Sequence, residues 1–221
     1  MDLRKMHNTA KRSFIREYVT NTSTILDAGC GAGGDLLKWP LGTRVFACDP
    51  DIRALTEAVE RSKNLTEEQR PQFFHGDVSS TPVQPYDIIC YNFSIQYIFA
   101  HERLFHRTLE ALCQRSQKGT RLMGVVPDSE ELMTCTQKFF KKDKPFTGDF
   151  GDMIQFYIRG TRYYKNGPIR EPVCYREILI TELEKVGFQL VLWEPFISFH
   201  TGTVSDVYSK FVFEYTKECG G

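Results

Sequence analysis

Three glycines in the segment LDAGCGAGGD (26–35) constrain the fold of this 221-residue chain more than any other feature of its sequence. Gly29, Gly31 and Gly34 have the spacing G-x-G-x-x-G, and they follow an apolar run that predicts a strand over 23–29. Glycine is needed where a strand turns tightly and a ligand must approach bare backbone. By itself the loop is compatible with a dinucleotide, with another nucleoside cofactor, or with a tight turn that binds nothing.

Apolar strands and helical segments alternate through the first two thirds of the chain. The pattern predicts strands over 44–49, 72–77, 86–92 and 120–126, and helices over 33–39, 51–65 and 101–117. Pro40 ends the first helix, and Ile52, Leu55 and Val59 recur at helical spacing in the second. Such alternation is typical of an α/β fold, with a mostly parallel sheet covered on both faces.

The last third of the chain has a different pattern. Residues 153–173 predict aromatic and β-branched strands around Asn166-Gly167, a pair that favours a hairpin turn. A helix is expected over 174–188, ended by Gly187, and strands over 188–193 and 207–215. This ending is typical of an α/β sheet that finishes with an antiparallel edge pair. No linker or repeat interrupts the chain, so we expect one domain over 1–221.

Charge and cysteine content exclude several classes of protein. Lys plus Arg and Asp plus Glu both number 28, which gives a formal net charge of zero. A protein that depends on non-specific attraction to nucleic acid is usually basic, so any RNA must be recognised by a small feature or through a partner. The seven cysteines include no C-x-x-C pair, which argues against a zinc site and fits a reducing compartment. Neither a membrane span nor a secretory signal is visible.

Three acidic residues lie where a nucleoside cofactor would need them. Asp49 ends the second strand, where a carboxylate can accept both ribose hydroxyls, and Asp77 ends the third, where it can meet an adenine amino group. Asp27 precedes the glycines, and its charge repels a pyrophosphate but suits a cationic amino acid or sulfonium. Each acid alone could be an ordinary turn or capping residue. As an ordered set they favour S-adenosylmethionine over NAD.

The segment LDAGCGAGGDLLKW resembles the motif of messenger-RNA cap (guanine-N7) methyltransferases, in which GDLLKW follows the glycines. The resemblance continues through HNTAKRSFI, YDIICYNFSIQYIF, GVVPDSEEL, REPVCYREIL and VYSKFVFEY. It implies a class I S-adenosylmethionine-dependent methyltransferase fold. That fold is a doubly wound, mostly parallel seven-stranded sheet with an antiparallel C-terminal strand. It also implies a strand-rich cap-pocket insertion at about 145–172.

The resemblance implies roles for individual residues on the cofactor side. The backbone from Gly29 to Gly31 and the ammonium of Lys11 would hold the methionine end of S-adenosylmethionine. Asn92 lies where the family contacts the same portion of the cofactor from the fourth strand. With the three acids, the expected cofactor-binding set is Lys11, Asp27, Gly29, Gly31, Asp49, Asp77 and Asn92.

On the cap side, Glu171 falls on the family's cap-reading glutamate and would accept hydrogen bonds from the guanine N1–H and amino group. Tyr97 and Tyr208 could line the guanine pocket, although a tyrosine more often packs than binds a ligand. Arg61 falls on a position that contacts the cap phosphates in the family, but it could equally pair with Glu57 on its own helix. The expected substrate-binding set is Asn8, Arg61, Gln96, Tyr97, Pro127, Glu171 and Tyr208.

Three departures from the family pattern affect the cap side more than the cofactor side. Ala32 stands where the family has a lysine, which removes one phosphate contact. Gln96 replaces the usual histidine, which keeps hydrogen bonding but loses any cationic form. Ile154 stands where tyrosine is common. The stacking wall, an aromatic side chain against which the guanine could stack, is therefore either missing or supplied by Phe156 or Tyr157. These changes indicate a divergent member, and viral capping enzymes are one source of such members.

The implied reaction is a direct in-line displacement at a sulfonium methyl group by guanine N7. Because N7 carries an available lone pair, we expect no acid or base, no metal, and catalysis by positioning and electrostatics. Glu171 and Tyr97 would lie beside the reacting guanine. The expected partners are 5′-capped RNA and the other domains of a capping enzyme, in the cytoplasm, or in the nucleus for a cellular enzyme.

Two other functions are compatible with the sequence. A class I methyltransferase acting on a small metabolite would leave GDLLKW and Glu171 unexplained. A non-catalytic module that binds cap or cofactor to stimulate a partner enzyme would explain Ala32 and Gln96, but not the cofactor acids. The basic stretch KFFKKDK (138–144) predicts a solvated helix end, with RNA contact as the alternative.

Overall fold

Seven strands form one sheet in the computed structural model, which describes residues 3–134, 140–142, 144–156 and 168–218. The strand order is β3-β2-β1-β4-β5-β10-β9, and neighbours from β3 to β5 are parallel. β10 runs antiparallel to both of its neighbours, β5 and β9, and so opposite to the other six strands described in this sheet. The strands are β1 Thr24–Ala28, β2 Arg44–Asp49, β3 Gln72–His75, β4 Ile88–Asn92, β5 Arg121–Pro127, β9 Phe188–Pro195 and β10 Tyr208–Tyr215. The expected doubly wound sheet with an antiparallel last strand is therefore confirmed.

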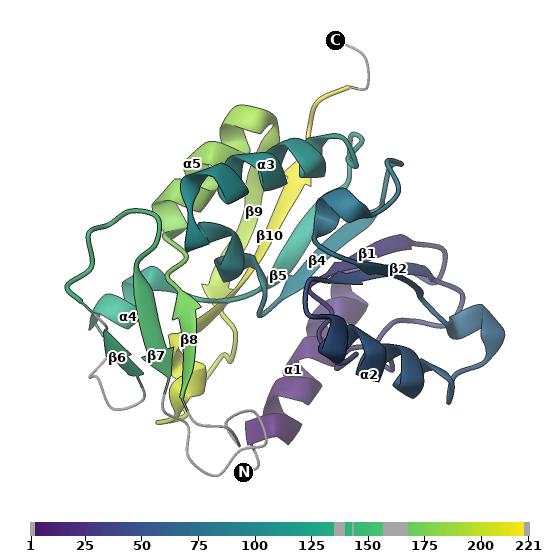
Figure 1. Ribbon diagram of the computed structural model, residues 1–221, viewed down its shortest axis with the longest axis horizontal. Helices are drawn as coiled ribbons and strands as arrows, with labels where there is room; N and C mark the ends of the chain where they lie inside the picture. The colour runs from purple at the N-terminus through teal and green to yellow at the C-terminus, as the bar shows by residue number, and fades with distance from the viewer. Residues whose placement is uncertain (1–2, 135–139, 143, 157–167, 219–221) are drawn as a thin grey trace.

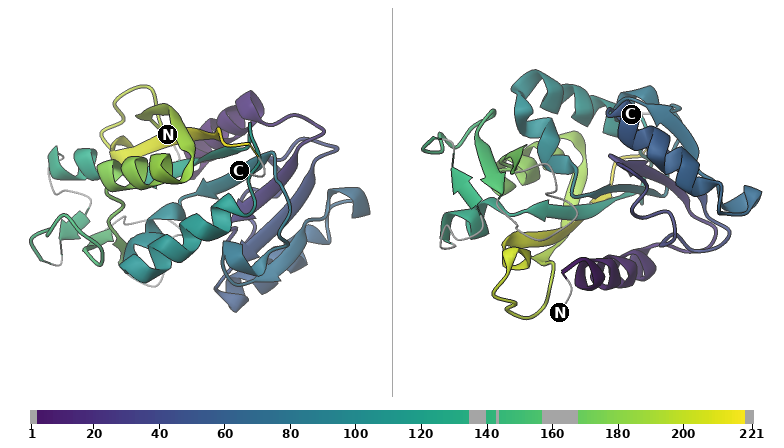
Figure 2. Two further views of the ribbon diagram at one scale, coloured as in Figure 1. Left: turned by 90° about the horizontal axis from the view of Figure 1, so that it is seen from above. Right: turned by 60° about the horizontal axis from the view of Figure 1, so that its bottom comes forward.

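Helices cover the two faces of this sheet (Figure 1). They are α1 Leu3–Tyr18, α2 Ile52–Ser62, α3 Glu102–Cys113, α4 Ser129–Thr134 and α5 Arg176–Val186. Figure 2 shows α1 on the opposite side of the sheet from α3 and α5. α5 ends where Gly187 adopts a φ of 111°, as its glycine predicted. None of the helices in the described part of the chain has the length and apolar character that a membrane crossing requires.

The predicted helix over 33–39 is wrong, because residues 31–38 form successive turns. Gly33 has a φ of +74°, which a right-handed helix cannot contain, and a side chain there would collide with Leu36. Conversely, the sequence pattern did not predict α1. Its buried face consists of Phe14 and Ile15, and most of its other side chains are polar.

A second, antiparallel sheet of three strands has the order β6-β7-β8. Its strands are β6 Phe140–Lys142, β7 Met153–Phe156 and β8 Ile169–Pro172. The helix end expected over 138–144 is wrong for 140–142, because Phe140 is buried and its ring packs against Phe156. The expected turn at Asn166-Gly167 and the side chain of Tyr157 lie outside the described residues.

The two sheets meet near the carboxyl ends of the parallel strands. β8 packs against the 3-10 helix η3 (Ile95–Ala100), which follows β4. The first residue of β10, Tyr208, pairs with Pro127 at the end of β5. Residues from the first and last parts of the chain are therefore brought to the edge where the glycine loop lies.

Candidate functional site

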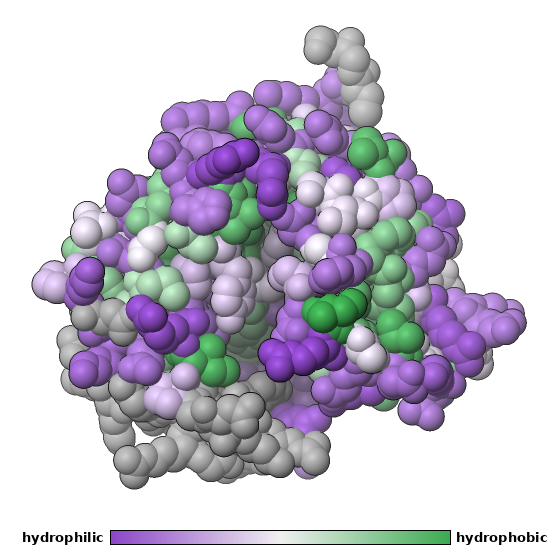
Figure 3. Space-filling model, viewed as in Figure 1, coloured by the Kyte–Doolittle hydropathy of each residue, from purple (hydrophilic) through white to green (hydrophobic). Residues whose placement is uncertain are grey.

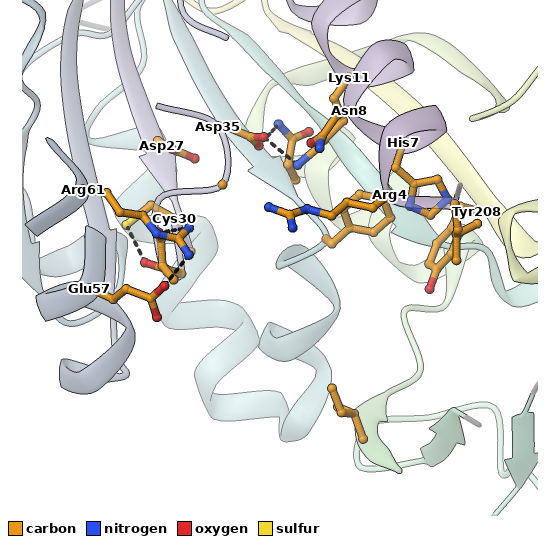
Figure 4. A pocket seen from close by; sticks show the side chains of 18 of the residues that line it. Arg4, His7, Asn8, Lys11, Asp27, Cys30, Asp35, Glu57, Arg61 and Tyr208 are labelled. Carbon is orange, nitrogen blue, oxygen red and sulfur yellow. Dashed lines mark hydrogen bonds and ion pairs between the residues drawn. The ribbon is translucent and has the colours of Figure 1, made fainter. Parts of the chain in front are cut away.

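A cavity of about 680 Å³ opens at this edge, between the glycine loop, α1, α2 and the start of β10. The hollow is visible near the centre of the face in Figure 3, and Figure 4 shows its side chains from close by. Most of the expected site residues line it: Asn8, Lys11, Asp27, Gly29, Gly31, Arg61, Asn92, Glu171 and Tyr208. The others, Asp49, Asp77, Gln96, Tyr97 and Pro127, do not.

The glycine loop takes its shape from contacts that exclude side chains. Gly29 has a φ of +76°, and a Cβ there would lie 2.4 Å from the Cβ of Ser94. A Cβ on Gly31 would meet no atom within 4 Å, so the backbone there is open to the cavity. The N–H of Gly31 donates to Asp49 Oδ2 at 2.7 Å, which ties the loop to the end of β2.

Asp35 organises a cluster of charges that the sequence pattern did not single out. Its Oδ1 lies 2.6 Å from Lys11 Nζ and 2.7 Å from Lys38 Nζ, and its Oδ2 accepts from Asn92 Nδ2 at 2.9 Å. Burial would raise the pKa of Asp35, but the two ammonium groups outweigh it and hold that pKa below its usual range. The motif GDLLKW could have indicated part of this cluster, because its Asp and Lys are Asp35 and Lys38.

Asp27 is almost fully buried beneath the loop. Desolvation, reinforced by the negative charge of Asp35, raises the pKa of Asp27 to about 8. A carboxyl group with this pKa is mostly protonated at pH 7 and becomes charged when a cation arrives beside it. The cofactor end of the cavity is therefore ready to receive positive charge.

Asp49 and Asp77 lie just outside the lining. Asp49 accepts from the N–H groups of Gly31 and Asp51, so it supports the loop that the cofactor would contact. Asp77 accepts from the N–H of Ser79 and pairs with Arg107 of α3. Burial opposes ionisation, but these hydrogen bonds and Arg107 lower the pKa of Asp77.

Arg61 forms the ion pair with Glu57 that the sequence analysis gave as the alternative to a phosphate contact. Its guanidinium hydrogen-bonds to Glu57, one turn earlier on α2. It also donates to the carbonyl oxygen of Ala32 at 2.8 Å, so it braces the glycine loop at the position of the missing family lysine. Both side chains line the cavity.

Aromatic rings close the other end of the cavity. Phe93, at a φ of 61°, stacks on His7 with centroids 5.6 Å apart and meets Tyr208 edge-on at 4.9 Å. His7 Nε2 lies 2.7 Å from Ser205 Oγ. Burial and then the charge of Lys11 lower the pKa of His7 to about 4, so its ring is neutral at pH 7. The sequence analysis missed His7, one residue before Asn8.

Glu171 faces this aromatic end from β8. Its Oε2 accepts from Gln96 Nε2 at 3.0 Å, and Gln96 Nε2 also donates to the carbonyl oxygen of Phe93 at 3.1 Å. Desolvation raises the pKa of Glu171 to about 7, although hydrogen bonds from Gln96 and Tyr97 work in the opposite direction. Gln96 and Tyr97 thus act on the cavity through Glu171 rather than by lining it.

Neither Ile154 nor Phe156 provides the expected stacking wall, and Tyr157 lies outside the described residues. Ile154 and Phe156 are both fully buried, and Phe156 packs against Tyr208 from behind. Ile169 and Phe93 line the cavity instead. In the described parts of the chain, no group of three His, Cys, Asp or Glu side chains is arranged to hold a metal ion.

Sequence comparisons point to one family. The model of the mRNA (guanine-N(7))-methyltransferase domain matches residues 1–166. An mRNA cap guanine-N(7) methyltransferase of Cryptococcus neoformans is 25% identical over 89% of this chain and 33% of its own length. The protein of the same name from Saccharomyces cerevisiae is 25% identical over 89% of this chain and 53% of its own length. The chain thus spans between a third and about half of these relatives.

Solved structures share the fold. A protein from Pyrococcus horikoshii OT3 has a TM-score of 0.72 and 16% identity, over 98% of this chain and 92% of that one. Several structures described as S-adenosylmethionine-dependent methyltransferases also match over 93% or more of the chain. The architecture is therefore that of the class I methyltransferases.

Proposed function

The chain belongs to the mRNA (guanine-N(7))-methyltransferase family, and on that premise we propose that it transfers a methyl group from S-adenosylmethionine to guanine N7 of a 5′ cap. The observation that carries the proposal is the cavity, which joins the glycine loop at one end to the carboxylate of Glu171 at the other. The nucleoside cofactor and the guanine can thus approach each other inside one cavity.

The cofactor end suits a ligand that carries positive charge. Asp27 gains a charge when a cation approaches, and Asn92 Oδ1 is a buried acceptor without a hydrogen-bond partner among the described residues. A methionine ammonium group would satisfy both acceptors. The open backbone at Gly31 and the carboxylate of Asp49 behind it suit the ribose side. A pyrophosphate would lie beside the carboxyl groups of Asp27 and Asp35, and the nearby ammonium groups of Lys11 and Lys38 are already paired with Asp35.

The guanine end suits a base that presents two adjacent donors. The carboxylate of Glu171 can accept from both the N1–H and the amino group of guanine, whereas adenine would leave it unpaired. Gln96 fixes one of its oxygens, and Tyr208 and Phe93 supply flat apolar surface beside it. We assign Asn8 and Arg61, which both line the cavity, to the cap phosphates, and Pro127 to support of Tyr208.

The residues around the cavity are arranged for positioning rather than for proton transfer. Bound S-adenosylmethionine would supply a methyl group on a sulfonium, and guanine N7 has a lone pair that needs no base. His7 is neutral at pH 7 and its ring nitrogen faces Ser205. The carboxylate of Glu171 favours the positive charge that guanine acquires on methylation. Orientation in the enclosed cavity lowers the barrier further.

Because the relatives are longer, we propose that the chain works together with other domains or subunits of a capping enzyme. We assign it to the compartment where capped transcripts are made, the nucleus for a cellular enzyme and the cytoplasm otherwise. Capped RNA would be the partner of the cavity in either case.

A methyl-transfer assay tests the proposed reaction directly. The protein is incubated with methyl-labelled S-adenosylmethionine and RNA that begins with GpppG, and the digested product is separated by chromatography. We expect label in 7-methylguanosine, and none with ApppG-capped or uncapped triphosphate RNA. Label transferred equally to uncapped RNA or to small molecules would indicate a different substrate. Tight binding of cofactor and cap without any transfer would indicate a non-catalytic module.

A further inference from the structure

A row of positive charge runs along the exposed side of α1. The helix contains five basic residues and one acidic residue, although the chain as a whole is neutral. Arg12 and Arg16 are one turn apart, and they line one groove along the helix together with Arg4 and Lys5. No ion pair among the described residues involves Lys5, Arg12 or Arg16. We call these four residues the α1 basic row.

The α1 basic row works against the stability of its own helix. Arg4 and Lys5 occupy the first turn, where the helix dipole disfavours cations, and the first turn holds no acidic residue among those described. Arg12 and Arg16 are a like-charge pair at i,i+4, which is also unfavourable. The charges of Lys5, Arg12 and Arg16, which have no ion-pair partner among the described residues, are best explained by an anion that lies against them when the protein functions.

The row continues directly from the cavity. A shallow groove of about 620 Å³ lies between its side chains. Arg4 and Asn8 line both this groove and the cavity that we assign to cofactor and cap. In Figure 4, Arg4 and Asn8 project from α1 toward the centre of the cavity. A polyanion that leaves the cavity over α1 would therefore meet Arg12 and then Arg16.

We infer that the α1 basic row binds the phosphate backbone of the RNA nucleotides that follow the cap. The inference rests on the proposed function, because it takes the cap to be held in the cavity. The groove beside the row is lined by basic and small polar side chains and by no aromatic ring on which bases could stack, so the row suits the phosphate backbone rather than the bases. The contact would be independent of RNA sequence. It would also explain how a neutral protein could bind RNA firmly.

The test compares capped substrates of different length. Initial rates are measured for the GpppG dinucleotide and for capped RNAs of five and fifteen unstructured nucleotides, with the chain and with Arg12→Gln/Arg16→Gln. We expect KM to fall with RNA length for the wild type. The variant should lose about fivefold or more in KM on the fifteen-nucleotide RNA and less than twofold on the dinucleotide. The slope of log affinity against log salt should become less steep by about 1.4.

The matched control is Arg70→Gln/Arg103→Gln, which removes the same charge from two exposed positions that line neither the cavity nor the groove. The α1 variant should melt at or slightly above the wild-type temperature, because it loses a like-charge pair and glutamine forms helices well, and the control should melt close to the wild type. An unchanged length dependence in the α1 variant, or an equal loss in the control, would overturn the inference. Absence of methyl transfer to every capped substrate would instead overturn the proposed function.

Discussion

Gln96 and Glu171 are joined by a hydrogen bond of 3.0 Å that connects the segment after β4 to strand β8. Gln96 Nε2 also donates to the carbonyl oxygen of Phe93, so its amide nitrogen faces two acceptors and its orientation is fixed. A neutral histidine, the usual family residue, has one ring N–H and could satisfy only one of them. The glutamine therefore keeps the carboxylate of Glu171 turned toward the cavity without carrying a charge itself.

Replacing Glu171 with glutamine should impair use of the cap selectively. The variant keeps the shape of the side chain but presents one acceptor and one donor to a base that offers two donors. We expect kcat/KM for GpppG-capped RNA to fall by about 10- to 150-fold, the loss of a hydrogen bond to a charged group. Calorimetry should give an unchanged affinity for S-adenosylmethionine. Glu177→Gln, an exposed carboxylate on α5, is the control, and equal activity of both variants would remove Glu171 from guanine recognition.

Cap binding should strengthen as the pH rises through about 7. Burial places the pKa of Glu171 near that value, and only the ionised carboxylate can accept both guanine donors. Stability should show the opposite trend, because a raised carboxyl pKa stabilises the fold below the unfolded value near 4.5, and this contribution is lost as the pH rises through 7. Fluorescence titration of GpppG from pH 5.5 to 8.5 measures the first effect. A pH dependence that persists in Glu171→Gln would assign it to another group.

Binding of S-adenosylmethionine should release a proton at neutral pH. Asp27 has a pKa raised to about 8, so most molecules carry it protonated at pH 7, and a cationic ligand favours the ionised form. The affinity should rise by up to about tenfold per pH unit below the pKa. Calorimetry in buffers of different ionisation enthalpy counts the protons. Asp27→Asn should release none, and its affinity should be flat with pH; proton release equal to that of the wild type would contradict this.

Asp49→Ala should weaken S-adenosylmethionine by about 10- to 150-fold. The change removes the acceptor for the ribose hydroxyls and also the support that Asp49 Oδ2 gives to the N–H of Gly31. Asp51→Ala removes a neighbouring carboxylate that caps α2 and leaves the loop contact intact. We expect that control to lower the melting temperature but to bind cofactor normally. Cofactor affinity preserved in folded Asp49→Ala would exclude this carboxylate from the site.

Features set by local pattern could be predicted from the sequence. The apolar runs predicted the seven strands of the large sheet, and the glycine spacing predicted the turn after β1, because both depend on neighbouring residues. The position of Asp27 before the glycines indicated a cofactor residue, those of Glu171 and Lys11 followed from motif resemblance, and all three line one cavity.

Features that depend on distant contacts could not be predicted. The basic surroundings of Phe140 suggested a solvated helix end, and only its packing against Phe156 makes it a strand residue. His7 is half-buried because Phe93 and Tyr208 pack against it, and they come from remote parts of the chain. Asp35 gains its second ammonium partner, Lys11, only once α1 lies over the loop. Burial of a polar residue is a property of its neighbours in space.

The contact between Gly29 and Ser94 restricts how this chain can diverge. A mutation from glycine at position 29 meets two independent obstacles, a left-handed backbone and the β-carbon of Ser94 at 2.4 Å. A compensating Ser94→Gly could remove the second obstacle but not the first, and it would also remove the hydrogen bond from Ser94 Oγ to the carbonyl oxygen of Ala28. Neither a single substitution of Gly29 nor its combination with Ser94→Gly removes both obstacles. Homologues whose residues differ at the cap end of the cavity should therefore still have a glycine at the position of Gly29.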